Sequence, residues 1–168
     1  MKNGFFVYYV ALIAAVILWG WSFASTKTAL LGVDAVTLTA YTFLFASGIL
    51  FFIELGRGKK PLFRFREGII LGIALLLIEL PQTIGIDLTS ASSAALITGL
   101  GILAVPFVNR LFFGEKIPKS LYLLAFSSLM GLFVLTNGWH GFGAGEWWLL
   151  LNCFGQAMYI IYSGRVEK

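Results

Sequence analysis

The chain has 168 residues, of which 59% are hydrophobic and 12% are charged, and its mean hydropathy is +0.90. A soluble domain carries about 25% charged residues, so this composition excludes a water-soluble globule. The net charge of +4 does not indicate a nucleic-acid partner, because the basic residues gather in particular loops between apolar segments. A single cysteine, Cys153, excludes an intrachain disulfide and a thiolate metal cluster.

Six long apolar segments follow one another along the chain. About 20 residues of helix cross a hydrocarbon core of ~30 Å, and helices are expected there because each span must satisfy its own backbone hydrogen bonds. We therefore predict an all-α fold, a polytopic transmembrane helical bundle in contact with the lipid bilayer. Its six spans are residues 5–25, 36–54, 68–86, 91–113, 120–138 and 147–163. The first apolar run is too long for a signal peptide, so we predict that it is retained.

The loops between these segments differ in charge. Of the 12 basic residues, Lys27 alone falls on one side of the predicted membrane, and the others lie at the two chain ends or in the second and fourth loops. Short cytoplasmic loops carry the excess of lysine and arginine. Both termini are therefore predicted to be cytoplasmic, in a multi-pass protein of the plasma (inner) membrane.

Polar residues occur at the exterior end of the first span. An aromatic belt explains Trp19 without any ligand. Ser22 follows it, and Lys27 either extends outward to the interface or guards an outward-facing vestibule. Small residues also recur four apart in the third span, at Gly68 and Gly72, and such spacing is typical of close helix packing.

The third span holds the sharpest candidate for a site. Glu79 lies about two residues from the span centre, where a charged carboxylate costs roughly 2.5–3.5 kcal/mol. Gln82 and Thr83 follow three and four residues later, on the same helix face. Pro81 removes the amide that would bond the Leu77 carbonyl. These groups predict a substrate site; the alternative is a neutral glutamic acid that is hydrogen-bonded inside the bundle.

The fourth and sixth spans add further polar residues. Ser90 is placed to act as the N-cap of the fourth helix. In the sixth span, Asn152, Gln156 and Tyr159 share one helical face. That face must meet protein or water, and cavity lining and helix–helix hydrogen bonding both remain open for it.

The chain shows no constellation of an enzyme. The spans hold no paired aspartates and no serine–histidine pair, and the lone His140 is placed in a glycine-rich stretch that we interpret as a connector. We therefore predict that the protein is not an enzyme and that it uses no cofactor and no metal.

Three stretches resemble the drug/metabolite transporter superfamily, in its EamA branch. They are the tryptophan-glycine opening LWGWSFASTK at residues 18–27, the fourth-helix signature TSASSAALITGL at 89–100, and the closing run LFFGEK at 111–116. The resemblance extends from about residue 10 to 164. One departure is Tyr41, near the place where the family often has an arginine.

The resemblance implies ten helices in two inverted five-helix repeats. Residues 1–138 then correspond to an EamA-like five-helix repeat, 139–146 to an exterior glycine-rich linker, and 147–168 to a sixth transmembrane helix that starts a second repeat. Because the family's central cavity uses both repeats, the chain holds about half of a pathway. A second copy or a partner half would complete it.

The predicted function is a membrane transporter, or a transporter half, that moves small metabolites such as amino acids. Glu79 is its candidate proton carrier or substrate contact. The alternatives are a truncated fragment without activity of its own and a membrane interaction or assembly protein. The predicted substrate-binding residues are Trp19, Ser22, Glu79, Gln82, Thr83, Asn152, Gln156 and Tyr159.

Overall fold

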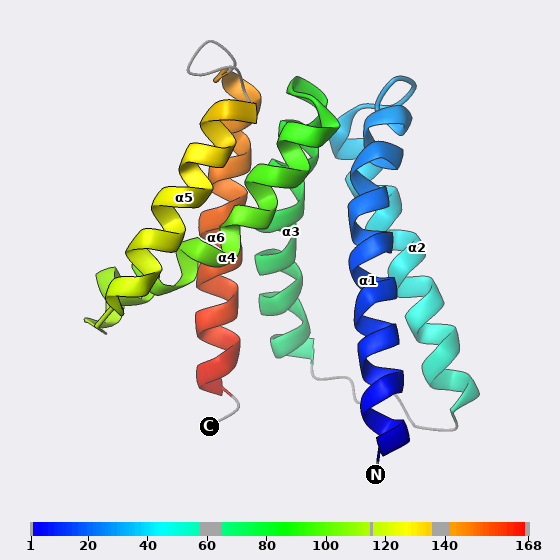
Figure 1. Cartoon of the computed structure of the whole chain (residues 1–168). Coiled ribbons are helices and arrows are strands. Elements are labelled where there is room, and N and C mark those ends of the chain that lie inside the picture. Colours follow the sequence, from blue (N-terminus) through cyan, green and yellow to red (C-terminus); the bar gives the residue numbers. More distant parts are fainter. Residues whose placement is uncertain (1, 58–64, 115, 136–141, 167–168) are drawn as a thin grey trace.

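The computed structural model describes residues 2–57, 65–114, 116–135 and 142–166. These ranges contain helices and no strand, which confirms the all-α bundle (Figure 1). The helices are α1 (Lys2–Ala29), α2 (Ala35–Gly56), α3 (Phe65–Leu88), α4 (Ala91–Phe113), α5 (Lys119–Leu135) and α6 (Ala144–Val166). They match the six predicted segments in order. Glu115 of the closing run, Trp139 and His140 lie outside the described residues.

Four of the helices are long and apolar enough to cross a membrane. They are Phe6–Ala29, Ala35–Gly56, Gly68–Leu88 and Ala91–Phe113. Within the described residues, α5 has 17 residues and is too short to be counted with them. Polar residues interrupt the apolar sequence of α6, which is not counted either. Successive helices run in opposite directions, and α1 begins at the end of the bundle where α6 ends (Figure 1). The side of the membrane on which these ends lie stays a prediction.

The helix boundaries follow from local capping groups. Asp34 is the N-cap of α2, and its Oδ1 accepts hydrogen bonds from the amides of Val36 and Thr37 at 3.1 and 3.0 Å. Hydrogen bonding from Thr37 holds the pKa of Asp34 below its usual value. Ser90 caps α4 as predicted, because its Oγ accepts from the Ser93 amide at 3.1 Å. A left-handed Gly114, with φ 70°, ends that helix.

The core lies where α6 packs against α3 and α4. Its buried residues come from four helices, and the main cluster comprises Phe23, Ile86, Ala94, Ile97, Leu149 and Cys153. By contrast, α1 and α2 keep most of their apolar side chains exposed, as expected for helices that face lipid.

Two glycines allow α3 and α6 to approach closely. A Cβ atom on Gly85 would lie 2.6 Å from Leu149 Cγ, and one on Gly145 would lie 3.0 Å from the Leu88 carbonyl carbon. Gly68 and Gly72, the pair that predicted packing from its spacing, face open space within this chain. The close contact at Gly85 is therefore made more than three turns further along α3 than the spacing indicated.

Pro81 leaves α3 continuous from Phe65 to Leu88. The Leu77 carbonyl, which Pro81 deprives of its amide partner, faces α6, since a Cβ atom on Gly155 would lie 3.7 Å from that oxygen. The freed carbonyl is therefore covered by protein at the α3–α6 contact.

Candidate functional site

A polar cleft of about 590 Å³ lies among α1, α2 and α3. It contains five of the eight predicted site residues, namely Trp19, Ser22, Glu79, Gln82 and Thr83. The structure adds Ser25 and Thr26 from α1 and Thr39 and Thr42 from α2, four residues that the prediction of binding residues left out. The two threonines of α2 were missed because nothing in the sequence of α2 indicates which of its faces turns toward Glu79.

Glu79 is the one titratable residue among those that line the cleft. In the described part of the chain its carboxyl group makes no ion pair, and the ion pair found there joins Arg57 to Glu54. Thr83 donates its hydroxyl to the Glu79 main-chain oxygen at 2.9 Å, not to the carboxyl group. The Glu79 carboxyl group is therefore available to an occupant of the cleft.

Four of the six hydroxyl groups that line the cleft donate to the backbone of their own helix. Ser22 donates to the Trp19 carbonyl at 2.6 Å. Thr39 donates to the Ala35 carbonyl at 2.7 Å, and Thr42 to the Leu38 carbonyl at 2.9 Å. Thr83 completes the set with its bond to the Glu79 carbonyl. Since each hydroxyl has one hydrogen, these four side chains present acceptor lone pairs to the cleft.

Asn152 lies outside the cleft and bonds α6 to α3. It is fully buried. Its Nδ2 donates to the Ile78 carbonyl at 2.8 Å and to Gln82 Oε1 at 3.2 Å. The sequence left cavity lining and helix–helix hydrogen bonding open for this face of α6. In the structure, Asn152 makes helix–helix hydrogen bonds.

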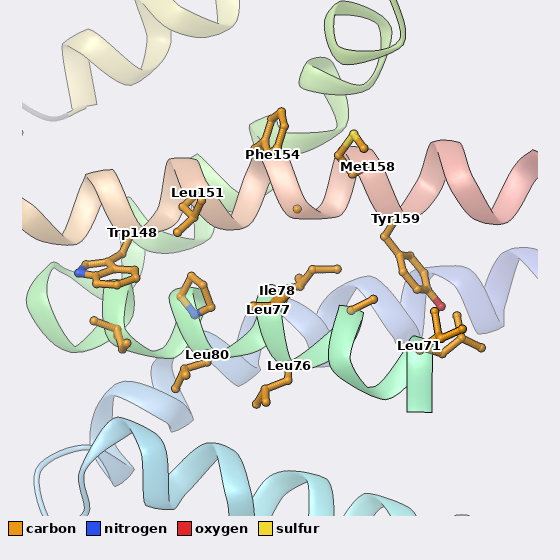
Figure 2. Close-up of a pocket in the computed structure, with 15 residues that line it drawn as sticks. Leu71, Leu76, Leu77, Ile78, Leu80, Trp148, Leu151, Phe154, Met158 and Tyr159 are labelled. Atoms are coloured by element: carbon orange, nitrogen blue, oxygen red, sulfur yellow. The ribbon is translucent and has the colours of Figure 1, made fainter. Parts of the chain in front are cut away.

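The structure also places Gln156 and Tyr159 away from the cleft. Gln156 lies against α4, where a Cβ atom on Gly101 would be 3.3 Å from its Oε1. Tyr159 lines a second, apolar cavity of about 630 Å³ between α3 and α6. Figure 2 shows Trp148 and Tyr159 at opposite ends of that cavity, both extending from α6.

Two charged residues have partners that the sequence did not indicate. Lys27 Nζ donates to the carbonyls of Ile86 and Asp87 at 2.9 and 2.6 Å, so it binds the carboxyl end of α3. This differs from both alternatives considered for Lys27, because its charge meets the negative end of a helix dipole.

Glu146 is buried at the start of α6. Its Oε2 accepts from the Gly143 amide at 2.7 Å, and its Oε1 accepts from the Thr89 hydroxyl. Glu146 lies in the first turn of α6, and an acidic residue at the start of a helix is a signal that could have been found in the sequence. The bond from Thr89 also ties the α3–α4 connection to α6.

Fold and cleft together define the class, a helical membrane protein that holds a polar, carboxyl-bearing cleft among apolar helices. The chain belongs to the EamA-like transporter family, whose model matches residues 6–137. It is 32% identical over 159 residues to an uncharacterized transporter of Archaeoglobus fulgidus, and the alignment covers 90% of this chain and 47% of that relative. The chain thus spans about half the length of this relative. No solved structure matches it.

Proposed function

We propose that this chain forms at least half of a transporter that moves small metabolites such as amino acids across the plasma membrane. The substrate would bind in the cleft among α1, α2 and α3. The observation that carries the proposal is the Glu79 carboxyl group, unpaired within the described residues, in a polar cleft of about 590 Å³. Membership of the EamA-like transporter family supports it.

The size and chemistry of the cleft favour a small polar substrate. Sites for small molecules measure about 300–1,000 Å³, and this cleft falls in that range. Glu79 and the hydroxyl oxygens accept hydrogen bonds, so they suit an ammonium group. Gln82 also lines the cleft and carries amide hydrogens that suit a carboxylate. A zwitterionic amino acid satisfies both sets of groups.

Glu79 is also the proposed proton carrier. It can take up a proton while the cleft faces one side of the membrane and release it on the other. An ionisable residue within a span is a common component of such relays. Because Glu79 is the one titratable residue among those that line the cleft, pH-dependent transport should depend on this one carboxyl group.

The test is uptake of radiolabelled amino acids by proteoliposomes under an imposed proton gradient. The expected result is gradient-dependent uptake by the wild type and uptake without pH dependence by Glu79→Gln. Glu54→Gln is the matched control, because Glu54 lies outside the cleft and pairs with Arg57 at 3.1 Å. Unaltered pH dependence in Glu79→Gln would exclude Glu79 from proton coupling.

A second copy or a partner half would complete the pathway under this proposal. The two alternatives to it are distinguished by experiment. A wild-type particle that takes up no substrate and forms no defined assembly would favour a fragment without activity. Stable capture of one foreign membrane protein without uptake would favour an interaction or assembly role.

A further inference from the structure

The Asn152 side chain has one permitted orientation. The Ile78 main-chain oxygen lies 2.8 Å from Asn152 Nδ2, and a carbonyl oxygen can only accept. Turning the amide over would place two oxygen atoms in contact there. The Asn152 NH₂ group therefore faces α3, and its second hydrogen is directed to Gln82.

This orientation fixes Gln82 in turn. The Gln82 atom at 3.2 Å from Asn152 Nδ2 must be an acceptor, so it is Oε1. The Gln82 NH₂ group is then the part of the amide that remains for the cleft, which Gln82 lines. Within the described residues, Gln82 Nε2 has no hydrogen-bond partner.

Four of the six hydroxyl groups that line the cleft do not offer their hydrogen to an occupant. Ser22, Thr39, Thr42 and Thr83 have donated their hydroxyl hydrogens to their own helices. A rotating hydroxyl can donate in any direction, whereas the Gln82 amide is held from the far side by a residue of another helix.

We infer that Asn152 is a positioning residue for substrate selection: it holds Gln82 so that the Gln82 NH₂ group binds the carboxylate end of a substrate. This inference rests on the proposed function and deepens it. Asn152 acts through Gln82, since it does not itself line the cleft. It also makes selection depend on α6, because displacement of α6 from α3 would free the Gln82 amide to turn.

The burial of Asn152 supports a directional role. It is fully buried, and its Oδ1 has no hydrogen-bond partner in the described part of the chain. Burying an unpaired polar atom is unfavourable, and leucine would fill a similar volume without that cost. What leucine cannot supply is the pair of hydrogens that orients Gln82.

The orientation can be tested without any ligand. The chain contains two glutamines, Gln82 and Gln156, so side-chain ¹⁵N-glutamine labelling gives two NH₂ signals in an NMR spectrum of the detergent-solubilised protein. We expect the Gln82 NH₂ signal to exchange rapidly with water and to shift in Asn152→Leu. Gln156→Leu assigns the second signal and should leave the first unmoved. A Gln82 NH₂ signal protected from water would overturn the inference.

The effect on selection is tested with two probes, phenylalanine and phenethylamine, which differ by the carboxylate. In Asn152→Leu the KM for phenylalanine should rise about tenfold, the loss of one hydrogen bond to a charged group, while kcat and the KM for phenethylamine stay within about twofold. Gln82→Leu should raise the KM for phenylalanine by the same factor. The double variant should raise it no further, because the two residues act as one unit. Asn152→Val repeats the test if Asn152→Leu does not fold.

The outcomes separate the two proposals. Equal rises in KM for both probes, or additive losses in the double variant, would overturn the role of Asn152 and leave amino-acid transport standing. Failure of the wild type to take up either probe would contradict the proposed function and, with it, the substrate part of this inference.

Discussion

At the scale of single residues, the polar groups of the membrane region divide into two kinds. Some are satisfied within the protein, as when Asn152 donates to Ile78 and Lys27 binds the end of α3. Others, chiefly the Glu79 carboxyl group, have no partner in the described residues and face a cleft. Because an unpaired polar group is costly in hydrocarbon, the second kind marks where a ligand, a proton or water is expected.

Lys27→Met should lower stability. The substitution keeps the aliphatic stem and removes the charge that meets the last carbonyls of α3, so a loss of about 1 kcal/mol is expected. The thermal midpoint of the detergent-solubilised protein measures it. Lys116→Met, which alters an exposed lysine outside the cleft, is the control. An equal change in both variants would contradict the capping role.

At the scale of elements, the contact between α3 and α6 organises the molecule. Gly85 and Gly145 let the two backbones approach, and Asn152 adds hydrogen bonds across the same contact. The sequence indicated that α6 has a polar face, but only the structure showed which helices that face contacts. α6 therefore has two roles. Its first turns pack closely against α3, and Asn152 near its centre orients Gln82.

Gly85→Ala should separate these helices. Its new methyl group would lie 2.6 Å from Leu149 Cγ, so an overpacking loss of about 1–3 kcal/mol is expected. Gly72→Ala is the matched control in the same helix, because a Cβ atom there meets nothing within 4 Å. The thermal midpoint of Gly85→Ala should therefore be lower than that of Gly72→Ala. Because alanine favours a helix more than glycine does, Gly72→Ala should not be destabilised, and a Gly72→Ala protein as unstable as Gly85→Ala would contradict the role of the contact with Leu149.

At the scale of the whole molecule, the chain exposes apolar side chains on every described helix. Lipid covers such surfaces, and so can further helices. We therefore expect the native particle to hold more than one chain of 18.5 kDa. Native mass spectrometry of the detergent-solubilised protein measures this. A single chain that still carries out uptake would contradict it.

The orientation in the membrane is a second property of the whole molecule. The loop charges predict cytoplasmic termini. A cysteine in place of Gly32 should react with an impermeant maleimide on intact cells, and one in place of Lys119 should react only after lysis. Cys153 is buried and gives a low background. Labelling of Lys119→Cys on intact cells would reverse the predicted orientation.

The helices, and the place of Glu79 near the middle of one of them, could be predicted from sequence because they rest on local properties. Runs of apolar residues set helix length, and serine at position 90 set a helix start. Trp19, Ser22 and Glu79 were each predicted as binding residues, and only the structure showed that they line one cleft. Asn152, Gln156 and Tyr159 were also predicted as binding residues because they share a helix face, but that face is divided between α3 and α4.

By itself, the sequence determined an all-α membrane bundle of six helices with a carboxyl group inside it, because hydropathy and charge act along the chain. Only the tertiary structure decided that Asn152 orients Gln82, that Lys27 closes α3, and that Glu79 faces α1 and α2. The physical reason is that rotation and register between helices depend on close contacts such as Gly85 with Leu149, which join residues far apart in the chain.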